Sequence, residues 1–269
     1  MSLTTAASRD RDHSAEHILS LRGIGKRFGA VRALTGVDMD VYAGEVVAIV
    51  GDNGAGKSTL VKILAGVHPQ DGGTISFYGE EQSLANPTVA RDLGIATVFQ
   101  DLALSDSLDV VSNLWLGREL TRGGVLDEIE MEQRSWSLLR ELSARVPSVR
   151  TPVASLSGGQ RQTVAIARSL IGEPSVVILD EPTAALGIAQ TAEVLNLIER
   201  LRERGLGVIL ISHNLADVLA VADRIVVLRL GRNNGNFRVA DVTSEQVIAA
   251  ITGATDHGSR RPTASEETR

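Results

Sequence analysis

The sequence contains no cysteine in its 269 residues. It therefore has no disulfides, no thiolate metal sites and no thiol nucleophiles. It also lacks any apolar run near the roughly 20 residues that a membrane-spanning helix needs. Residues 1–16 are polar, without the apolar core of a signal peptide, so we expect neither secretion nor a membrane span. Positive charge is not in excess either, because the formal net charge is -6, and this argues against a nucleic-acid partner.

Strand-like and helix-like patterns alternate along most of the chain. Residues 36–42 alternate apolar and polar side chains, as a half-exposed antiparallel strand does. Residues 46–50 are instead a continuous apolar run, and residues 175–179 and 208–212 are apolar except for Ser175 and Ser212; such runs are typical of strands buried on both faces. Strands that are separated by helices favour a parallel sheet. The sequence therefore predicts an α/β fold with a mostly parallel sheet and an N-terminal antiparallel β subdomain.

The middle of the chain has a different character. From residue 101 to about residue 152 it is polar and favours helix formation. Residues 130–145 place Met131, Trp136 and Leu139 among charged side chains, which is an amphipathic helical pattern. We expect an α-helical subdomain here, inserted into the α/β core.

Two local signals lie near the C-terminal end. Asn233, Asn234 and Gly235 predict the turn of a β-hairpin between residues 226–230 and 237–242. Thr243 and Gln246 predict a capping box that opens a last helix. Beyond residue 253 the chain is polar, and we expect it to be disordered.

Residues 51–58 match the phosphate-loop pattern G-x-x-x-x-G-K-[ST], between a buried-strand pattern and a helical pattern. Glycines let backbone N–H groups curl around phosphate oxygens, and the helix N-terminus adds the positive end of its dipole. Lys57 supplies a charge for the β- and γ-phosphates, and Ser58 a hydroxyl for Mg²⁺. A chance glycine-rich turn is the alternative, which the strand–loop–helix context disfavours. The residues assigned to nucleotide binding here are Gly51, Asp52, Asn53, Gly54, Ala55, Gly56, Lys57, Ser58 and Thr59.

A second motif is the apolar run of residues 176–179, which ends in Asp180 and Glu181. The carboxyl end of a strand is where an α/β sheet places its ligand chemistry. Asp180 is suited to hold Mg²⁺ through water, because Mg²⁺ keeps much of its hydration shell. Glu181 is suited to act as the general base that positions an attacking water. A solvated acidic strand end is the alternative, and the nearby phosphate loop makes it less favourable.

A third motif is Ser157-Gly158-Gly159-Gln160, which precedes an apolar-periodic helix. Ser157 is expected to cap this helix whatever its function. The three motifs in this order resemble the nucleotide-binding domain of the ABC ATPase family, over about Ile18 to Ala254. In that family this third motif, the signature, faces the γ-phosphate that a partner's phosphate loop holds. The resemblance implies an enzyme that binds ATP and Mg²⁺ and hydrolyses ATP as a head-to-tail dimer.

The same resemblance implies a domain organisation and further site residues. It assigns residues 17–254 to an ATPase domain with a P-loop NTPase core and a helical subdomain at about 101–155, and residues 1–16 and 255–269 to disordered segments. Gln100 matches the family's glutamine that senses Mg²⁺ and the membrane partner, and His213 matches its histidine that contacts the γ-phosphate. Phe28 matches its aromatic that stacks on adenine. Taken alone, a histidine is more often structural, and Phe28 fits a core aromatic equally well.

One position departs from the family pattern. After Glu181, residues 184–187 read Ala-Ala-Leu-Gly, so Gly187 stands where the family usually has an aspartate that communicates across the dimer. This departure puts the usual coupling of the two sites in doubt. It removes no phosphate, metal or base group, so the sequence still indicates an active enzyme.

Five short segments resemble in sequence the ATPases of simple-sugar importers. They are residues 51–53, 100–104, 109–114, 184–187 and 231–235. The resemblance implies a second ATPase subunit, transmembrane permease subunits and, indirectly, a substrate-binding protein as partners. It implies a peripheral location at the cytoplasmic face of the cell membrane. Two alternatives stay open. One is a soluble ABC ATPase outside transport, a class of protein that usually carries long insertions, a fused second domain or basic arms. The other is a regulatory module that no longer hydrolyses ATP, which only Gly187 supports.

Overall fold

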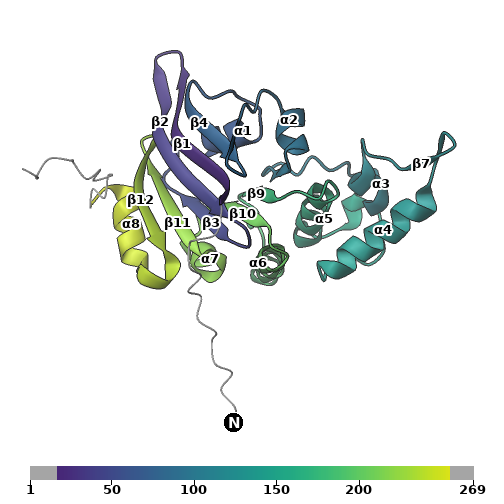
Figure 1. The fold of residues 1–269 in the computed structure, drawn as a ribbon. Helices are drawn as coiled ribbons and strands as arrows, with labels where there is room; N and C mark the ends of the chain where they lie inside the picture. The colour runs from purple at the N-terminus through teal and green to yellow at the C-terminus, as the bar shows by residue number, and fades with distance from the viewer. Residues whose placement is uncertain (1–16, 255–269) are drawn as a thin grey trace, which may run out of the picture.

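A computed structural model describes residues 17–254. The expected disordered segments, 1–16 and 255–269, lie outside these described residues. Two sheets occupy one half of the molecule, and a group of helices with a small hairpin extends away from them (Figure 1). The fold class predicted from the sequence, an α/β P-loop core with an antiparallel β subdomain and an inserted helical subdomain, is confirmed.

The central sheet has six strands in the order β12-β11-β3-β10-β9-β6. Neighbouring strands are parallel from β11 to β6, and β12 runs antiparallel to β11. Along β3, Val46 and Ala48 enter one hydrophobic core and Val47 and Ile49 enter the other. Burial on both faces is the reason why these strands are continuous apolar runs. The strands are β3 (Val46–Val50), β6 (Ile95–Val98), β9 (Val176–Asp180), β10 (Gly207–Ile211), β11 (Arg224–Arg229) and β12 (Arg232–Arg238).

The second sheet is antiparallel, with the order β2-β1-β4-β5. It contains the alternating segment predicted at residues 36–42, and Val37, Met39 and Val41 are buried there. These side chains share a core with helix α1 and one face of the central sheet. The strands are β1 (His17–Phe28), β2 (Val31–Tyr42), β4 (Gly72–Phe77) and β5 (Glu80–Gln82).

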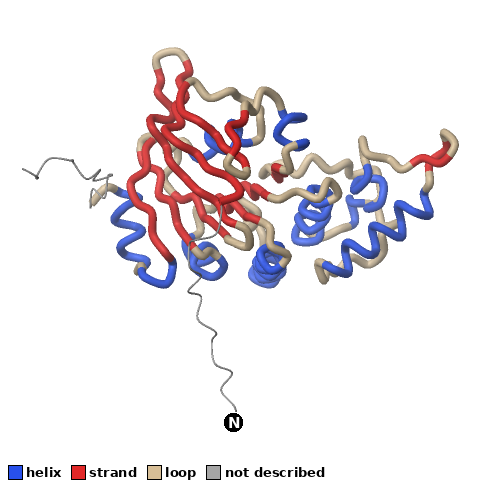
Figure 2. The backbone as a smooth tube through the Cα atoms, viewed as in Figure 1, coloured by secondary structure: helices blue, strands red, loops and turns tan. Residues whose placement is uncertain are grey.

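Helices cover both faces of the central sheet. The helices that follow the phosphate loop and the helices in the second half of the chain pack on the two sides of this sheet. Helices α3 and α4 and a short hairpin lie instead at the end of the molecule away from the sheet (Figure 2). In the described range no helix combines the length and apolar character that crossing a membrane requires. The helices and the hairpin are α1 (Lys57–Leu64), α2 (Pro87–Asp92), α3 (Val110–Trp115), β7 (Thr121–Arg122), β8 (Val125–Leu126), α4 (Glu128–Glu141), α5 (Gly158–Leu170), α6 (Ile188–Glu203), α7 (Leu215–Val221) and α8 (Ser244–Thr252).

The hairpin turn predicted at Asn233–Gly235 is wrong. The turn lies at Leu230 and Gly231, which have φ of 48° and 76°, and the Asn-Asn-Gly run belongs to β12. The Asn233 amide bonds the backbone N–H and C=O of Asp38, at 2.8 and 3.0 Å. These long-range bonds hold in a strand a run that favours a turn on its own. The strand predicted at 237–242 is also shorter, because a 3₁₀ turn covers Val239–Asp241.

Two other local predictions can be compared directly. Thr243 and Gln246 form the capping box that opens α8, as predicted. The amphipathic helix predicted at residues 130–145 is α4, which starts two residues earlier and ends at Glu141. It ends there because Ser143 takes a left-handed conformation with φ of 50°, which breaks helical geometry.

Candidate nucleotide site

The phosphate loop lies between β3 and α1, as its motif requires. Gly51 has φ of 151°, and a Cβ there would sit 2.1 Å from the carbonyl oxygen of Leu228. Gly56 has φ of 105°, and a Cβ there would sit 2.8 Å from the carbonyl oxygen of Ala33. Neither position has room for a side chain, so glycine is required for this loop to close against its neighbours.

Lys57 is nearly buried and spans the loop. Its Nζ donates to the carbonyl oxygens of Gly51, at 2.6 Å, and Asp52, at 3.1 Å. Gly56, which precedes α1, offers no side-chain cap, so side chains leave the first-turn N–H groups of Ser58 and Thr59 available. A helix N-terminus of this kind, beside a lysine ammonium, suits a phosphate group.

Two adjacent carboxylates follow β9. Asp180 ends the strand, and Glu181 turns out of it with a left-handed φ of 51°. The backbone N–H of Glu181 donates to the carbonyl oxygen of Ile211 on neighbouring β10, at 2.9 Å. Burial raises the pKa of Asp180, and the charge of Glu181 raises it further, while Lys57 opposes both effects. The pair therefore concentrates negative charge at the carboxyl end of the sheet, beside the phosphate loop.

His213 contacts Glu181 directly. Its Nδ1 lies 2.7 Å from Glu181 Oε2, and its backbone N–H donates to the same oxygen at 3.4 Å. The Glu181 side chain is 15% exposed and that of His213 is 71% exposed. The strand end keeps the histidine backbone fixed, because Ser212 is buried and its Oγ accepts from the backbone N–H of Asn214. The carboxylate is thus oriented by a residue from the loop that follows the adjacent strand β10.

A cavity of about 510 Å³ is lined by Gly51, Glu181 and His213, among the groups described above. Leu215 at the start of α7 and Ile251 in α8 form apolar parts of its wall and were missed from the sequence. Their only sequence signal is the apolar periodicity of their helices, which does not separate a cavity wall from core. The lining residues are Val50, Gly51, Asp52, Asn53, Gln100, Glu181, Ser212, His213, Leu215 and Ile251.

The signature motif opens α5. Ser157 Oγ accepts from the backbone N–H of Gln160, and Gln160 Oε1 accepts from the backbone N–H of Ser157, so the predicted cap is present as a full capping box. A Cβ at Gly158 would lie 2.9 Å from Leu186 Cδ2, and one at Gly159 would lie 3.0 Å from Gln190 Cβ. The glycines therefore let α5 pack against the start of α6.

Several predicted site residues lie outside the cavity wall of the described chain. Residues 54–59 of the phosphate loop, which include Lys57 and Ser58, do not line it, and neither does Asp180, which directly precedes the lining residue Glu181. The signature residues do not line it, and neither does Phe28. Phe28 ends β1, is 45% exposed, and packs edge-on against the ring of His68 with 5.3 Å between ring centroids. The cavity of a single chain therefore gathers Gly51–Asn53 of the phosphate loop with Gln100, Glu181 and His213, and the signature does not contribute to its wall.

A contact near the acidic pair was also missed from the sequence. Thr183 Oγ1 donates to Asp217 Oδ2 at 2.7 Å, which ties the loop after Glu181 to α7. Among residues 17–254, no group of three or more His, Cys, Asp or Glu side chains is arranged to hold a metal ion. Mg²⁺ sites in phosphoryl transfer use one or two carboxylates, waters and phosphate oxygens, so the donor set of Asp180 and Ser58 fits that pattern.

Comparisons with known proteins agree with this geometry. A family model described as ABC transporter matches residues 34–184. The xylose/arabinose import ATP-binding protein XylG of Sulfolobus acidocaldarius is 43% identical over 235 residues, which is 87% of this chain and 94% of that protein. The fructose import ATP-binding protein FrcA of Rhizobium meliloti is 44% identical over 247 residues, which is 89% of this chain and 95% of that protein.

Solved structures give the same result. An ATP-binding cassette of an ABC transporter in its ADP conformation has a TM-score of 0.76 at 28% identity, and the match covers 88% of this chain and 95% of that one. A dimeric bacterial ABC transporter cassette has a TM-score of 0.70 at 25% identity, with 82% and 98% covered. The family model matches more than half of the chain and the import relatives match most of it, so the chain belongs to the ABC transporter family as one of its ATP-hydrolysing, ATP-binding subunits.

Proposed function

We propose that this chain powers the import of a simple sugar, and that two copies act as a head-to-tail pair docked on permease subunits at the cytoplasmic face of the membrane. The sugar assignment is supported by relatives that are named for xylose/arabinose and fructose import and match most of the chain. The pairing is supported by the likeness to a dimeric transporter cassette. A substrate-binding protein would deliver the sugar to the permease, so it contacts this subunit only indirectly.

The separation of the signature from the cavity carries the proposal. Gly51–Asn53 of the phosphate loop line the cavity with Gln100, Glu181 and His213, whereas no residue of Ser157–Gln160 lines it. Each surface presents a helix N-terminus, which suits phosphate: that of α1 has no side-chain cap, whereas that of α5 carries the Ser157–Gln160 capping box. Two copies in opposite orientation would place each signature against the nucleotide on the other copy.

The residues of the site divide the work of phosphoryl transfer. Phe28, with a half-exposed ring, stacks on adenine, while the backbone N–H groups of the phosphate loop and the Lys57 ammonium hold the phosphates. Asp180, Ser58 and Gln100 would hold Mg²⁺, in part through water. The chemistry supplied by that ion would be neutralisation of negative charge on the transferring phosphoryl group.

Glu181 and His213 supply the remaining function. The Glu181 carboxylate accepts a proton from, or orients, the attacking water, and His213 holds that carboxylate through the 2.7 Å contact of its Nδ1. Phosphoryl transfer depends mainly on positioning and charge neutralisation, so these few side chains suffice. Closure of the pair on ATP and its reopening after hydrolysis would move Gln100 and the helical subdomain, and through them the permease.

Two experiments test the proposal. ATP turnover of the purified chain and of its Glu181→Gln variant tests the catalytic assignment, and equal turnover would contradict it. Uptake of radiolabelled xylose, ribose and fructose by source cells with and without this chain tests the cargo. Loss of uptake for one of these sugars supports sugar import, whereas unchanged uptake of all of them contradicts it.

A further inference from the structure

Two loops are joined to one another, one on the cavity side of the chain and one on the signature side. One loop follows Gln100 and runs through residues 105–109 into α3, and the other runs through residues 148–156 into the signature helix α5. Backbone hydrogen bonds connect them, and Asp109 and Pro152 form an isolated antiparallel bridge. The bonds are Val110 N to Thr151 O, Val111 N to Val149 O, Val153 N to Leu108 O and Ala154 N to Asp106 O, at 3.0 to 3.2 Å.

Asn113 fixes the shape of the first loop from inside. It is fully buried in α3, and its Oδ1 accepts from the backbone N–H of Ser105 at 2.7 Å. Its Nδ2 donates to the carbonyl oxygens of Ser105, Leu108 and Asp109. A buried amide with its partners in place permits one loop conformation, because any other would leave polar groups unpaired.

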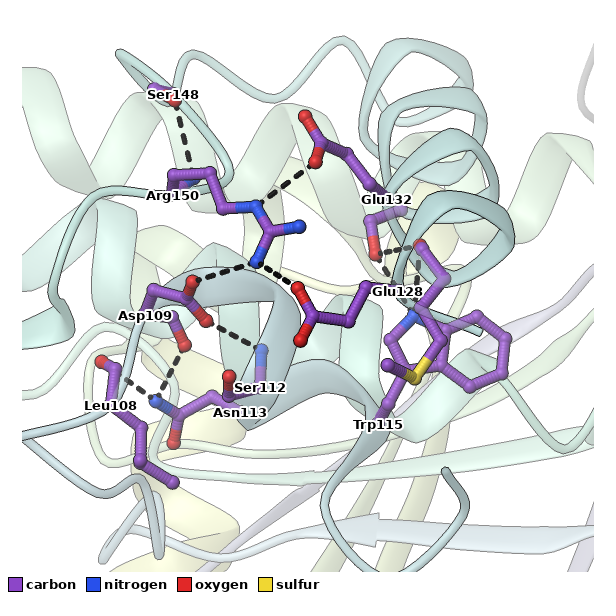
Figure 3. Close-up of polar contacts among 11 residues, drawn as sticks. Leu108, Asp109, Ser112, Asn113, Trp115, Glu128, Glu132, Ser148 and Arg150 are labelled. Carbon is purple, nitrogen blue, oxygen red and sulfur yellow. Dashed lines mark hydrogen bonds and ion pairs between the residues drawn. The ribbon is translucent and has the colours of Figure 1, made fainter. Parts of the chain in front are cut away.

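Arg150 holds the second loop from outside, as Figure 3 shows. Its Nε lies 2.9 Å from Glu132 Oε2, and its Nη1 lies 3.2 Å from Glu128 Oε2 and 3.6 Å from Asp109 Oδ2. Asp109 uses its other oxygen, Oδ1, to cap α3 through the backbone N–H of Ser112 at 2.8 Å. One guanidinium therefore ties the second loop to α4 and to the N-terminus of α3. We call these four residues the Arg150 clamp: Asp109, Glu128, Glu132 and Arg150.

The second loop also grips the signature itself. Gln160 Nε2 donates to the carbonyl oxygen of Arg145 at 2.8 Å, while Gln160 Oε1 closes the capping box with Ser157. Arg161 pairs with Asp106 of the first loop at 3.2 Å and donates to Ala154 O at 3.1 Å. Any shift of residues 145–156 is thus transmitted to the first turn of α5.

Arg150 and Glu128 are exposed and Asp109 and Glu132 are half-buried, which separates the effect of the clamp on position from its effect on folding. The Arg150 side chain is 43% exposed, and ion pairs of this exposure add little to global stability. Removing the guanidinium would nevertheless leave Asp109, Glu128 and Glu132 facing one another as like charges. Their repulsion would act to separate α4 from the N-terminus of α3, and the second loop would lose its tie to both.

We propose that Arg150 is a positioning residue for the shared nucleotide site, because its three-carboxylate clamp fixes the segment that presents Ser157–Gln160 to ATP on a second copy. This inference rests on the proposed head-to-tail pairing. It also links the loop after Gln100 to the signature of the same copy, so that one copy's contributions to the two nucleotide sites of the pair move as one unit.

The test compares three single variants of the full chain. Arg150→Gln removes the charge, Arg150→Lys keeps the charge but not the fork geometry, and Arg134→Gln is the control. Arg134 lies on α4, the helix that carries Glu128 and Glu132, and it pairs with Glu130 at 2.7 Å. ADP affinity reports on the phosphate loop of a single copy. ATP turnover, measured without any change at Glu181, and ATP-driven pairing, measured in a Glu181→Gln background, report on the shared site.

Arg150→Gln is expected to keep ADP affinity within about twofold and to lower turnover by about tenfold or more, because small misplacements of binding groups cost that much. ATP-driven pairing, measured by sedimentation, should weaken in parallel. Arg150→Lys should recover part of the loss, since a lysine can serve one carboxylate but not all three. Arg134→Gln should match the parent chain. If Arg150→Gln folds poorly, Glu132→Gln is expected to give a smaller loss of turnover at unchanged ADP affinity.

The outcomes separate this inference from the proposed function. A parent chain that shows neither turnover nor ATP-driven pairing overturns the proposed function and this inference with it. A parent that shows both, with Arg150→Gln unchanged or with ADP affinity falling in step with turnover, overturns the role of Arg150 alone. An unchanged Glu132→Gln variant also counts against the clamp.

Discussion

Glu181 and His213 share one short contact, in which Nδ1 of the histidine lies 2.7 Å from Oε2 of the carboxylate. The two residues come from different loops, after β9 and after β10, and they line the same cavity. The backbone N–H of His213 reaches the same oxygen, so the histidine fixes the carboxylate through two atoms. This contact makes the two residues one structural unit.

Replacement of His213 by alanine tests that unit. We expect ATP turnover to fall by about 100-fold, the lower range for loss of a positioned acid–base group, with ADP affinity nearly unchanged. His213→Gln should recover part of the activity, because an amide can still donate to Glu181. Residues that act as a unit are not additive, so Glu181→Gln/His213→Ala should be no slower than Glu181→Gln alone. Independent, multiplying losses would contradict the unit.

Lys57→Ala is expected to remove most nucleotide affinity and keep the fold. The ammonium donates to Gly51 O and Asp52 O, and in a complex it would pair with phosphate. Loss of charged hydrogen bonds predicts an affinity about 10 to 100 times weaker, measured by ADP titration. Lys62→Ala is the matched control, because Lys62 is an exposed residue of the same helix. Equal ADP affinity in the Lys57 variant and the parent chain would show that the cradle is misplaced.

Much of the site could be predicted because its signals are local. The phosphate loop needs a strand, a glycine-rich turn and a helix in succession, and all three lie within residues 46–64. The capping boxes of α5 and α8 each lie within four residues. Patterns of this kind fix geometry before the rest of the chain is considered.

The remainder depends on segments that meet only in the folded chain. Asn233 lies in a strand because its amide bonds Asp38, 195 positions away. The Arg150 clamp joins a loop, a helix cap and a helix from three parts of the sequence. Exposed arginines and glutamates are common on helices, so nothing in the local sequence distinguishes these pairs from solvated charges.

Asp180→Asn is expected to stabilise the chain at neutral pH while it lowers ATP turnover. The pKa of Asp180 is raised, first by burial and then by Glu181, so the folded state disfavours the ionised form. The Asp180 contribution to stability is therefore fully present below the ordinary value of about 3.9 and is lost as the pH rises through the raised value. The variant should melt about 1 to 3 °C above the parent chain at about pH 8 and level with it at about pH 4.

An exposed aspartate provides the control for this pH dependence. Asp241 lies on the surface, and Asp241→Asn should not reproduce the pH-dependent gain. A variant at position 180 that melts below the parent chain at high pH would show that ionised Asp180 is stabilised, contrary to its environment.

Gly187 is the position where the sequence departs from the family pattern, and it tests coupling between the two sites. Gly187 has φ of -75°, it is exposed, and a Cβ there would meet nothing within 4 Å. It is the N-cap of α6 and offers no side-chain bond, so an aspartate fits and would cap the helix. Gly187→Asp should therefore leave the free energy of unfolding unchanged or raise it by about a few tenths of a kcal/mol. The melting temperature should stay level or rise slightly.

The functional effect expected from Gly187→Asp is stronger cooperativity in ATP turnover. The glycine follows Leu186, whose Cδ2 would lie 2.9 Å from a Cβ at Gly158, so this loop packs beside the signature. An added carboxylate at that position would respond to the second copy, and the Hill coefficient for ATP should rise. Gly187→Ala separates charge from backbone stiffening, since it adds a Cβ without a carboxylate. A Hill coefficient that rises equally in both variants would assign the effect to backbone stiffening. A Hill coefficient that is unaltered in Gly187→Asp would show that this loop has no role in the coupling between the two sites.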